Sequence, residues 1–461
     1  MRVSKEKKED QFLKLYKQLN PAQKEAVDSI EGPVMVVAGP GTGKTQVLGL
    51  RIANILRRTD TPPDAILALT FTNAGVQAMR ERLTTIIGSA AYRAAINTFH
   101  GFCNEIINRY PEEFPRIIGA QNATRVEQIK IAEQVIAKAR LKLLRPYGAP
   151  FYYLSAALEA IEKLKKENVT PTQLTKMAIG PKEKELALIY RVYEQALRQA
   201  RLYDFADMIM EVLTVLKKKK IFLRRLQEEY LYILADEHQD ANQSQNELLA
   251  LLANYHENPN LFIVGDEKQA IFQFQGASLD NFNYFKKLYP TAKLIRLTEN
   301  YRATQTLLDA AHHLISQSNL PAEVLTPLRS QNSQITEKIK VTAAANLAVE
   351  QRFVAEDIKM RLKAGVVPEE IAVIYRDNAD AEALVAALER AGLLFVIESQ
   401  SDLLNDITIS KLILILETIH HFGADDFLFR FLHLDFLHLE PLKIYELLEQ
   451  SRKQKKSLYL L

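Results

Sequence analysis

Residues 33–46 read PVMVVAGPGTGKTQ, and these residues are the most informative about the fold. Its first six residues form a short apolar, β-branched run that ends abruptly in glycines. The residues that follow, QVLGLRIANILRR (46–58), have helical periodicity. The pattern therefore predicts a strand, a glycine-rich turn and a helix. In such a turn, small residues let successive backbone N–H groups point inward around phosphates, at a helix N-terminus that favours negative charge.

The turn matches the phosphate-loop pattern, with Ala38 where the strict pattern has glycine. Lys44 is expected to reach the β- and γ-phosphates, and the Thr45 hydroxyl to bind Mg²⁺. ATP and Mg²⁺ are therefore the expected cofactors. The residues expected to contact the nucleotide here are Ala38, Gly39, Pro40, Gly41, Thr42, Gly43, Lys44, Thr45 and Gln46.

Other short, continuous apolar runs recur along the chain with helical stretches between them, as a buried parallel sheet requires. These runs are ILALTF (66–71), YILA (232–235), LFIV (261–264) and LIRL (294–297). The sequence therefore predicts an α/β fold.

Two carboxylates, Asp236 and Glu237, directly follow the YILA run. This position is the carboxyl end of a predicted strand, where doubly wound sheets place their ligands. Hydrolysis of a γ-phosphate needs one carboxylate on Mg²⁺ and another that orients or deprotonates the attacking water. We therefore expect Asp236 to bind the metal and both residues to serve catalysis.

The chain has 461 residues, enough for about three domains and too many for a single small binding module. Between about residues 111 and 200, long segments of helical periodicity predict a helical insertion. A second α/β unit is expected later, with helices over 350–363 and 380–391 and a strand over 371–375. Beyond residue 400 the pattern is helical.

Composition excludes several classes of protein. The net charge of +3 is too small to indicate a nucleic-acid partner by itself, so such a partner has to be inferred from local sites. The single cysteine, Cys103, excludes an intrachain disulfide and any multi-cysteine metal cluster, and is expected to be a buried apolar residue. No apolar run approaches the ~20 residues of a membrane span. A cytoplasmic location is expected.

Several motifs follow one another in order along residues 19 to about 400. They are LNPAQKEAV (19–27), AGPGTGKT (38–45), LTFTNAGVQAM (69–79), NTFHGFC (97–103), YDFADM (203–208), LADEHQD (234–240), IVGDEKQAIFQFQGA (263–277), LTENYRAT (297–304) and IAVIYRDNAD (371–380). With this ordered set, the chain resembles the N-terminal two-thirds of UvrD/Rep-type superfamily 1 DNA helicases.

The resemblance implies a P-loop NTPase (RecA-like) domain with a helical insertion, then a partial second RecA-like domain and the start of a helical subdomain. The implied boundaries are 1–112 and 200–298 for RecA-like domain 1A, 113–199 for insertion 1B, 299–399 for the first half of domain 2A, and 400–461 for the start of subdomain 2B. Neither of the family's last two motifs is found in 400–461. A truncated gene product, an incomplete record or half of a split protein is therefore expected.

Further nucleotide-site roles come from the resemblance. Gln23 belongs to the family's adenine-reading motif, and Tyr301 offers a ring to stack on the base. Gln269 is implied to sense the γ-phosphate and link it to DNA. Arg302 matches an arginine finger, which stabilises charge on the transferred phosphoryl group. Arg51, on the helix after the phosphate loop, is also expected to approach the nucleotide.

For DNA, the resemblance implies that Phe71, Phe272 and Phe274 lie in the DNA-facing motifs. Stacking on bases tolerates any sequence and is worth roughly 1–3 kcal/mol per base. Thr72, Asn73 and His100 are the expected polar neighbours. His100 is equally compatible with a satisfied buried histidine, because no second metal ligand stands at useful spacing.

Four positions depart from the family's pattern. Ala74 and Gly75 replace a lysine and an alanine, Gln275 replaces an arginine, and His238 replaces the tyrosine of DEYQD. These changes are expected to weaken DNA affinity or its coupling to ATP more than nucleotide binding.

The expected function is an ATP-dependent 3′→5′ translocase on single-stranded DNA that separates strands in repair or replication. Its expected partners are single-stranded DNA and single/double-strand junctions. Two alternatives remain. One is an ATP- and DNA-binding module with little turnover, and the other is the helicase part of a helicase–nuclease complex.

Overall fold

The computed structural model describes residues 11–269, 280–318, 324–332, 338–397, 407–454 and 456–461. The chain divides into two compact units, Met1–Ile339 and Lys340–Leu461. Each unit is described by itself.

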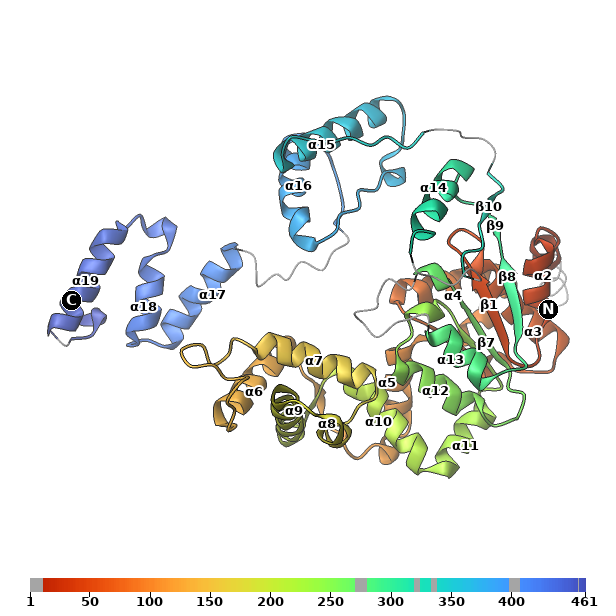
Figure 1. The fold of residues 1–461 in the computed structure, drawn as a ribbon, viewed down its shortest axis with the longest axis horizontal. Helices are drawn as coiled ribbons and strands as arrows, with labels where there is room; N and C mark the ends of the chain where they lie inside the picture. Colours follow the sequence, from red (N-terminus) through yellow and green to blue (C-terminus); the bar gives the residue numbers. More distant parts are fainter. Residues whose placement is uncertain (1–10, 270–279, 319–323, 333–337, 398–406, 455) are drawn as a thin grey trace. The chain divides into compact units, whose positions relative to one another are not determined.

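The first unit is built on a six-stranded parallel sheet in the order β3-β2-β6-β7-β1-β8 (Figure 1). Its strands are β1 (Val34–Ala38), β2 (Ile66–Thr70), β3 (Ala95–Thr98), β6 (Tyr232–Ala235), β7 (Leu261–Gly265) and β8 (Lys293–Leu297). Strand β1 lies between β7 and the edge strand β8, with Val36 in register with Val264 of β7 and Ile295 of β8. Because the strands are parallel, the segments that follow β1, β6 and β7 meet at one edge of the sheet.

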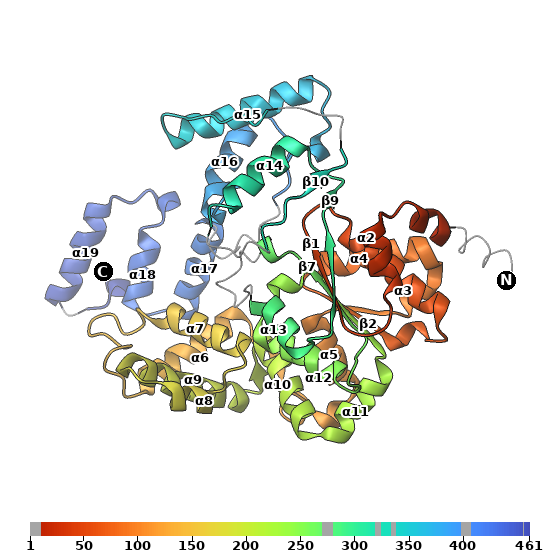
Figure 2. The ribbon, with the colours of Figure 1, turned by 45° about the vertical axis from the view of Figure 1, so that its right-hand side comes forward.

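Helices cover both faces of this sheet, as Figure 2 shows. Along β1, Val34, Val36 and Ala38 enter one hydrophobic core and Met35 enters the other, which is the period-two alternation of a strand buried on both sides. One face is covered by α2 (Pro21–Asp28), α3 (Lys44–Arg58) and α4 (Asn73–Ile87). The other is covered by α5 (Phe99–Arg109), α10 (Phe205–Lys218), α11 (Lys220–Glu229), α12 (Gln243–Ala253) and α13 (Asp280–Leu288).

A helical layer with its own core lies between α5 and α10 in the sequence. It consists of α6 (Arg125–Lys138), α7 (Leu154–Lys166), α8 (Pro171–Met177) and α9 (Pro181–Gln199). Buried residues such as Ile161, Tyr190 and Leu197 form this core. The chain enters and leaves the layer beside the paired strands β4 (Gln121–Asn122) and β5 (Leu202–Tyr203). We call residues 125–199 the helical insertion.

After β8, the chain continues past the carboxyl end of the sheet, beside the glycine-rich turn. Strand β9 (Glu299–Asn300) pairs with β10 (Arg329–Ser330), and α14 (Gln305–Ile315) lies between them in sequence. The backbone N–H of Tyr301 donates to the carbonyl of Gly41, 2.9 Å away. This hydrogen bond holds the segment beside the glycine-rich turn.

The second unit contains α15 (Leu347–Lys363), which packs on α16 (Asn378–Arg390), and α17 (Ile407–His420), which packs on α18 (Asp425–Leu432). Helix α19 spans Pro441–Gln454. The predicted strand over 371–375 is wrong: within the described part of this unit the segment is extended but pairs with no strand, and Ile374 is 94% exposed. A strand exists only where a neighbour supplies the hydrogen bonds, and an apolar run does not reveal that neighbour.

Short 3₁₀ turns complete the described elements. They are η1 (Pro63–Ala65), η2 (Gly88–Tyr92), η3 (Pro111–Glu113), η4 (His238–Asp240), η5 (Glu267–Gln269), η7 (Pro368–Glu370), η9 (Asp435–Leu437) and η10 (Leu458–Leu460). The predicted α/β fold class is confirmed, because helices flank a parallel sheet on both faces. Among the residues the structure describes, no helix is both long and apolar enough to cross a membrane.

Candidate nucleotide and nucleic-acid site

The glycine-rich turn joins the carboxyl end of β1 to the first turn of α3. Gly41 and Gly43 have φ angles of 72° and 86°, the left-handed region that favours glycine. The Thr42 hydroxyl donates to the carbonyl of Gly39 at 2.7 Å, which closes the turn. The backbone therefore forms a tight loop at the N-terminus of α3, the place where helices bind phosphate.

Side chains from segments distant in sequence lie close to the glycines of this turn. A Cβ added to Gly41 would lie 2.7 Å from the Arg302 Cβ, and one added to Gly43 would lie 2.9 Å from the Gln23 Nε2. At Gly39 it would lie 2.7 Å from a methyl group of Leu328. At Gly41, backbone conformation and the contact with the Arg302 Cβ both favour glycine.

The carboxylates predicted from the sequence lie next to the lysine of the turn. Lys44 Nζ donates to Glu237 Oε2 at 2.8 Å. The Glu237 backbone N–H donates to Asp236 Oδ1 at 2.9 Å. Glu237 has a φ of 47°, an uncommon conformation for a residue with a side chain, which costs of order 1–3 kcal/mol. Such strain is typical of functional sites.

The residues at this edge fit a Mg²⁺–nucleotide complex chemically. The Asp236 carboxylate is buried, and burial together with the charge of Glu237 raises the pKa of Asp236 to about 6. A cation would stabilise its charged form. The hydroxyl of Thr45 and the carboxylate of Asp236 are hard oxygen donors of the kind Mg²⁺ prefers.

The chain also matches models of known protein families. A family model described as the UvrD/REP helicase N-terminal domain matches residues 19–290. The chain belongs to the UvrD/Rep helicase family. A second model, the UvrD-like helicase C-terminal domain, matches residues 295–454.

Curated proteins of this family resemble the chain over most of its length. The ATP-dependent DNA helicase PcrA of Staphylococcus epidermidis is 33% identical over 373 residues, which cover 80% of this chain and 49% of that protein. PcrA of Staphylococcus aureus strain Mu50 is 32% identical over the same length and the same shares. The chain spans about half the length of the curated relatives it matches.

The two residues expected to meet the adenine of ATP both lie beside the turn. Gln23 is buried, and its Nε2 donates to the carbonyl of Thr42 at 2.8 Å. The Tyr301 hydroxyl donates to Glu299 Oε2 at 2.9 Å and accepts from Asn20 Nδ2 at 3.0 Å. The half-exposed ring of Tyr301 is thereby fixed next to the loop.

Arg302 and Gln269 approach the same edge from different segments. The Arg302 Cβ lies over Gly41, and its backbone N–H donates to the Asn300 side chain at 2.9 Å. Gln269 ends η5, just past β7, and its N–H donates to the carbonyl of Asp266 at 3.0 Å. Both positions are compatible with the roles that the UvrD/Rep family implies for them.

Arg51 requires a correction. Its guanidinium is fully buried and donates to the carbonyls of Ala26, Ser29 and Ile30 at the end of α2, while packing 4.3 Å from the ring centroid of Phe262. These contacts join α2 to α3 and turn the side chain into the core. Arg51 therefore serves packing, and the expectation that it approaches the nucleotide is wrong.

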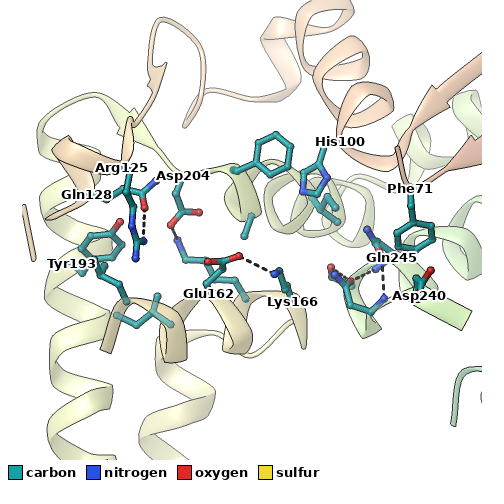
Figure 3. A pocket seen from close by; sticks show the side chains of 18 residues that line it. Phe71, His100, Arg125, Gln128, Glu162, Lys166, Tyr193, Asp204, Asp240 and Gln245 are labelled. Carbon is teal, nitrogen blue, oxygen red and sulfur yellow. Dashed lines mark hydrogen bonds and ion pairs between the residues drawn. The ribbon is translucent and has the colours of Figure 1, made fainter. Parts of the chain in front are cut away.

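A cavity of about 510 Å³ lies between the sheet domain and the helical insertion, and Figure 3 shows its lining. Its aromatic lining residues are Phe71, His100 and Phe205. Arg125, Glu162 and Lys166 line it from the insertion. Asp240, Asn242 and Gln245 line it from η4 and α12, close to the phosphate site in sequence.

The aromatic residues of the cavity pack on neighbouring rings. The rings of His100 and Phe205 are stacked, with centroids 3.8 Å apart and planes inclined by 20°, and Phe205 is 53% exposed. Burial and the nearby Lys166 lower the pKa of His100 to about 4, so its ring is neutral at pH 7. Phe71 packs on Phe99. The exposed ring of Phe205 is therefore suited to stacking on bases.

The sequence pattern alone does not indicate Phe205 as a site residue. It stands in the YDFADM motif, directly after Asp204, which caps α10, and only its exposure in the cavity marks it out.

The remaining sequence candidates are placed as follows. Thr72 caps α4 by accepting from the N–H of Gly75 at 3.0 Å, and Asn73 begins that helix, both at the surface. Phe272, Phe274 and Gln275 lie outside the described residues. A Cβ added to Gly75 would lie 2.6 Å from the Thr70 hydroxyl, so this departure from the family's pattern matches tight local packing.

Cys103 is a free, fully buried cysteine, as predicted, and burial raises its pKa. It contributes to the core beneath the sheet. It takes no part in the site.

Proposed function

We propose that this chain binds ATP with Mg²⁺ at the phosphate loop and hydrolyses it to move along single-stranded DNA. The observation that carries the proposal is the convergence of Lys44, Glu237 and Asp236 at one sheet edge, with Arg302 and Tyr301 held over the loop. The names of its relatives, ATP-dependent DNA helicases, support the same reaction.

In this proposal each residue has a distinct task. The backbone N–H groups of the loop and Lys44 bind the β- and γ-phosphates, which requires Lys44 to exchange its contact with Glu237 for phosphate oxygens. Glu237 then accepts a proton from the attacking water. Arg302 stabilises charge on the phosphoryl oxygens, and Gln269 senses the γ-phosphate. Thr45 and Asp236 would hold Mg²⁺, which supplies charge neutralisation between the phosphates.

The cavity beside the helical insertion is the proposed site for the DNA strand. Phe71, His100 and Phe205 would stack on bases, which favours single strands without sequence preference. Movement in the 3′→5′ direction, action at single/double-strand junctions, a role in repair or replication and a cytoplasmic location are parts of the same proposal, taken from the family resemblance.

The experiment is an ATPase assay on the full chain, with and without a single-stranded oligodeoxynucleotide. Turnover stimulated by DNA supports the proposal. Lys44→Ala should reduce kcat by roughly 10²–10³-fold, because a phosphate-stabilising charge is lost. Lys443→Ala is the control, since Lys443 pairs with Glu440 at 3.2 Å on an exposed surface. Binding of ATP and DNA without turnover would contradict the motor and favour the binding module.

Polarity is tested with partial duplexes that carry either a 3′ or a 5′ single-stranded tail. Displacement of the strand only from the 3′-tailed substrate is expected. Preference for the 5′ tail would contradict the proposed direction.

A further inference from the structure

Gln239 lies buried between the ends of β6 and β7, within hydrogen-bonding reach of the proposed catalytic carboxylate. Its Oε1 accepts from the backbone N–H of Asp266 at 2.9 Å, and its Nε2 donates to Glu237 Oε2 at 2.8 Å. Only 2% of the residue is exposed. The amide therefore has a fixed orientation, with its oxygen toward β7 and its nitrogen toward the carboxylate.

The surroundings leave Gln239 little freedom. A Cβ added to Gly265 would collide with Gln239 Oε1, so the end of β7 has glycine where the amide passes. The carbonyl of the same Asp266 accepts from the N–H of Gln269, 3.0 Å away. Gln239 thus connects Glu237 to the turn that presents Gln269.

The Glu237 carboxylate depends on this contact. Among the described side chains, Lys44 and Gln239 donate to it, both to Oε2. When Lys44 turns to bound phosphate, the amide of Gln239 is the donor that remains. Glu237 also sits at a strained φ of 47°, and a strained residue keeps its position only when its neighbours fix it.

Gln239 also reaches toward the cavity. Its Nε2 lies 3.4 Å from Asp240 Oδ2, and Asp240 lines the cavity proposed for the DNA strand. A ligand that moves Asp240 can therefore change the hydrogen bonding of the amide, and through it the position of Glu237.

We propose that Gln239 is a positioning residue that orients the Glu237 carboxylate for water attack and links it, through Asp240, to the single-strand cavity. This proposal rests on the proposed ATPase function. It differs from the role of Gln269, because Gln239 acts on the carboxylate and contacts no substrate.

The test uses two variants of the full chain, Gln239→Met and Gln239→Glu. Gln239→Met removes both hydrogen bonds at similar size. It should lower kcat at least tenfold, leave the KM for ATP within about twofold, and reduce the stimulation by a dT oligonucleotide. Gln239→Glu keeps the shape but removes the donor, and its carboxylate repels Glu237. The acidic limb of its kcat–pH profile should therefore move upward by about one pH unit.

The matched control is Gln77→Met. Gln77 is an exposed glutamine on α4 whose Nε2 donates to Glu81 Oε1 at 2.9 Å, away from the phosphate loop. It should keep the wild-type kcat, stimulation and pH profile. Binding of a fluorescent ATP analogue, measured for each variant, shows that the site is folded.

Three results separate the possibilities. Wild-type-like kcat and pH profile in both Gln239 variants would overturn the positioning role while leaving the ATPase proposal intact. Reduced kcat with unchanged DNA stimulation and pH profile would overturn the link to Asp240 and the orientation of Glu237. Absence of turnover in the wild-type chain would overturn the proposed function itself, before any variant is compared.

Discussion

His238 is buried at the start of η4. It packs against the rings of Phe282 and Phe285. Burial lowers the pKa of His238 to about 4. The side chain is thus a buried imidazole that is neutral at pH 7.

The low pKa of His238 predicts how stability depends on pH. The unfolded chain protonates this histidine near pH 6.5, whereas the folded chain does so only near pH 4. Stability is therefore lost as pH falls from about 6.5 toward 4, by about 2 kcal/mol at pH 5 from this residue. His238→Phe should remove this pH-dependent part of the free energy of unfolding. The melting temperature of the variant should therefore fall less than that of the wild type between pH 7 and 5.

The control for this prediction is His256→Phe, which changes an exposed histidine in the loop after α12. It should follow the wild-type curve. Parallel melting curves for His238→Phe and the wild type would contradict the burial of a neutral ring.

At the residue scale, the sequence predicted those site residues whose position follows from a strand end. Lys44, Asp236 and Glu237 each stand within a few residues of a buried apolar run, and the structure brings them together. Arg51 and Gln239 show the limit. The Arg51 side chain is directed by contacts with residues 26–30, and the Gln239 side chain by its contact with Asp266. These partners are distant in sequence, so no local pattern encodes the contacts.

At the element scale, α7 and α9 of the helical insertion are joined to α10 by a buried charge cluster. The Lys165 side chain is fully buried and contacts Glu194 at 2.5 Å, Asp207 at 2.9 Å, and Asp204. Arg116 contacts Glu194 and Glu211 at 2.7 and 3.1 Å. Burial alone would lower the pKa of Lys165, but the carboxylates raise it well above its ordinary value.

Lys165→Met should destabilise the protein by about 3–5 kcal/mol, because it leaves buried carboxylates without their cation. Urea denaturation measures the change. Lys163→Met on the exposed face of the same helix should change stability by less than about 0.5 kcal/mol. Equal stabilities for the two variants would show that the cluster contributes little to holding the insertion on α10.

Helix α10 also presents Phe205 to the cavity, stacked on His100. Phe205→Ala should weaken binding of a dT oligonucleotide by roughly 1–3 kcal/mol, about 5- to 150-fold, because one stacking surface is lost. ATP affinity should not change. Fluorescence anisotropy measures both, and Phe151→Ala, at a partly exposed phenylalanine in the loop before α7, is the control.

If Phe205→Ala bound the oligonucleotide as tightly as the wild type, the cavity would not be the base-stacking site. A matched loss in Phe151→Ala would point to a general effect of removing surface aromatics.

Elements were predictable where burial on both faces makes a strand continuously apolar. Runs such as those of β1, β6 and β7 were recognised for this reason. The edge strand β3 reads only AINT and carries no such signal. The segment 371–375 has such an apolar run but pairs with no strand in the described structure. The expected domain boundaries, from 1–112 for the first part of domain 1A to 400–461 for the start of subdomain 2B, remain predictions.

At the scale of the whole molecule, a net charge of +3 spread over 461 residues argues against a large positive field. Three cationic side chains line the described cavity: Arg125, Lys165 and Lys166. Lys165 is buried and paired with Glu194 and Asp207, and Lys166 is paired with Glu162 at 2.8 Å. Binding of single-stranded DNA should therefore rely on stacking more than on release of counterions, and its salt dependence should be shallow.

The salt dependence separates these two contributions. Each phosphate contact adds about −0.7 to the slope of log Kobs against log[salt] for single strands. Arg125→Gln combined with Lys166→Gln should therefore make the slope less negative by about 1.4, whereas Phe205→Ala should lower affinity equally at every salt concentration. Anisotropy titrations between about 50 and 300 mM NaCl, over which the Debye length falls roughly twofold, measure both effects. If the double variant has the same slope as the wild type, the DNA phosphates do not contact Arg125 or Lys166. Removing cations that contact the DNA backbone must reduce the number of counterions released on binding.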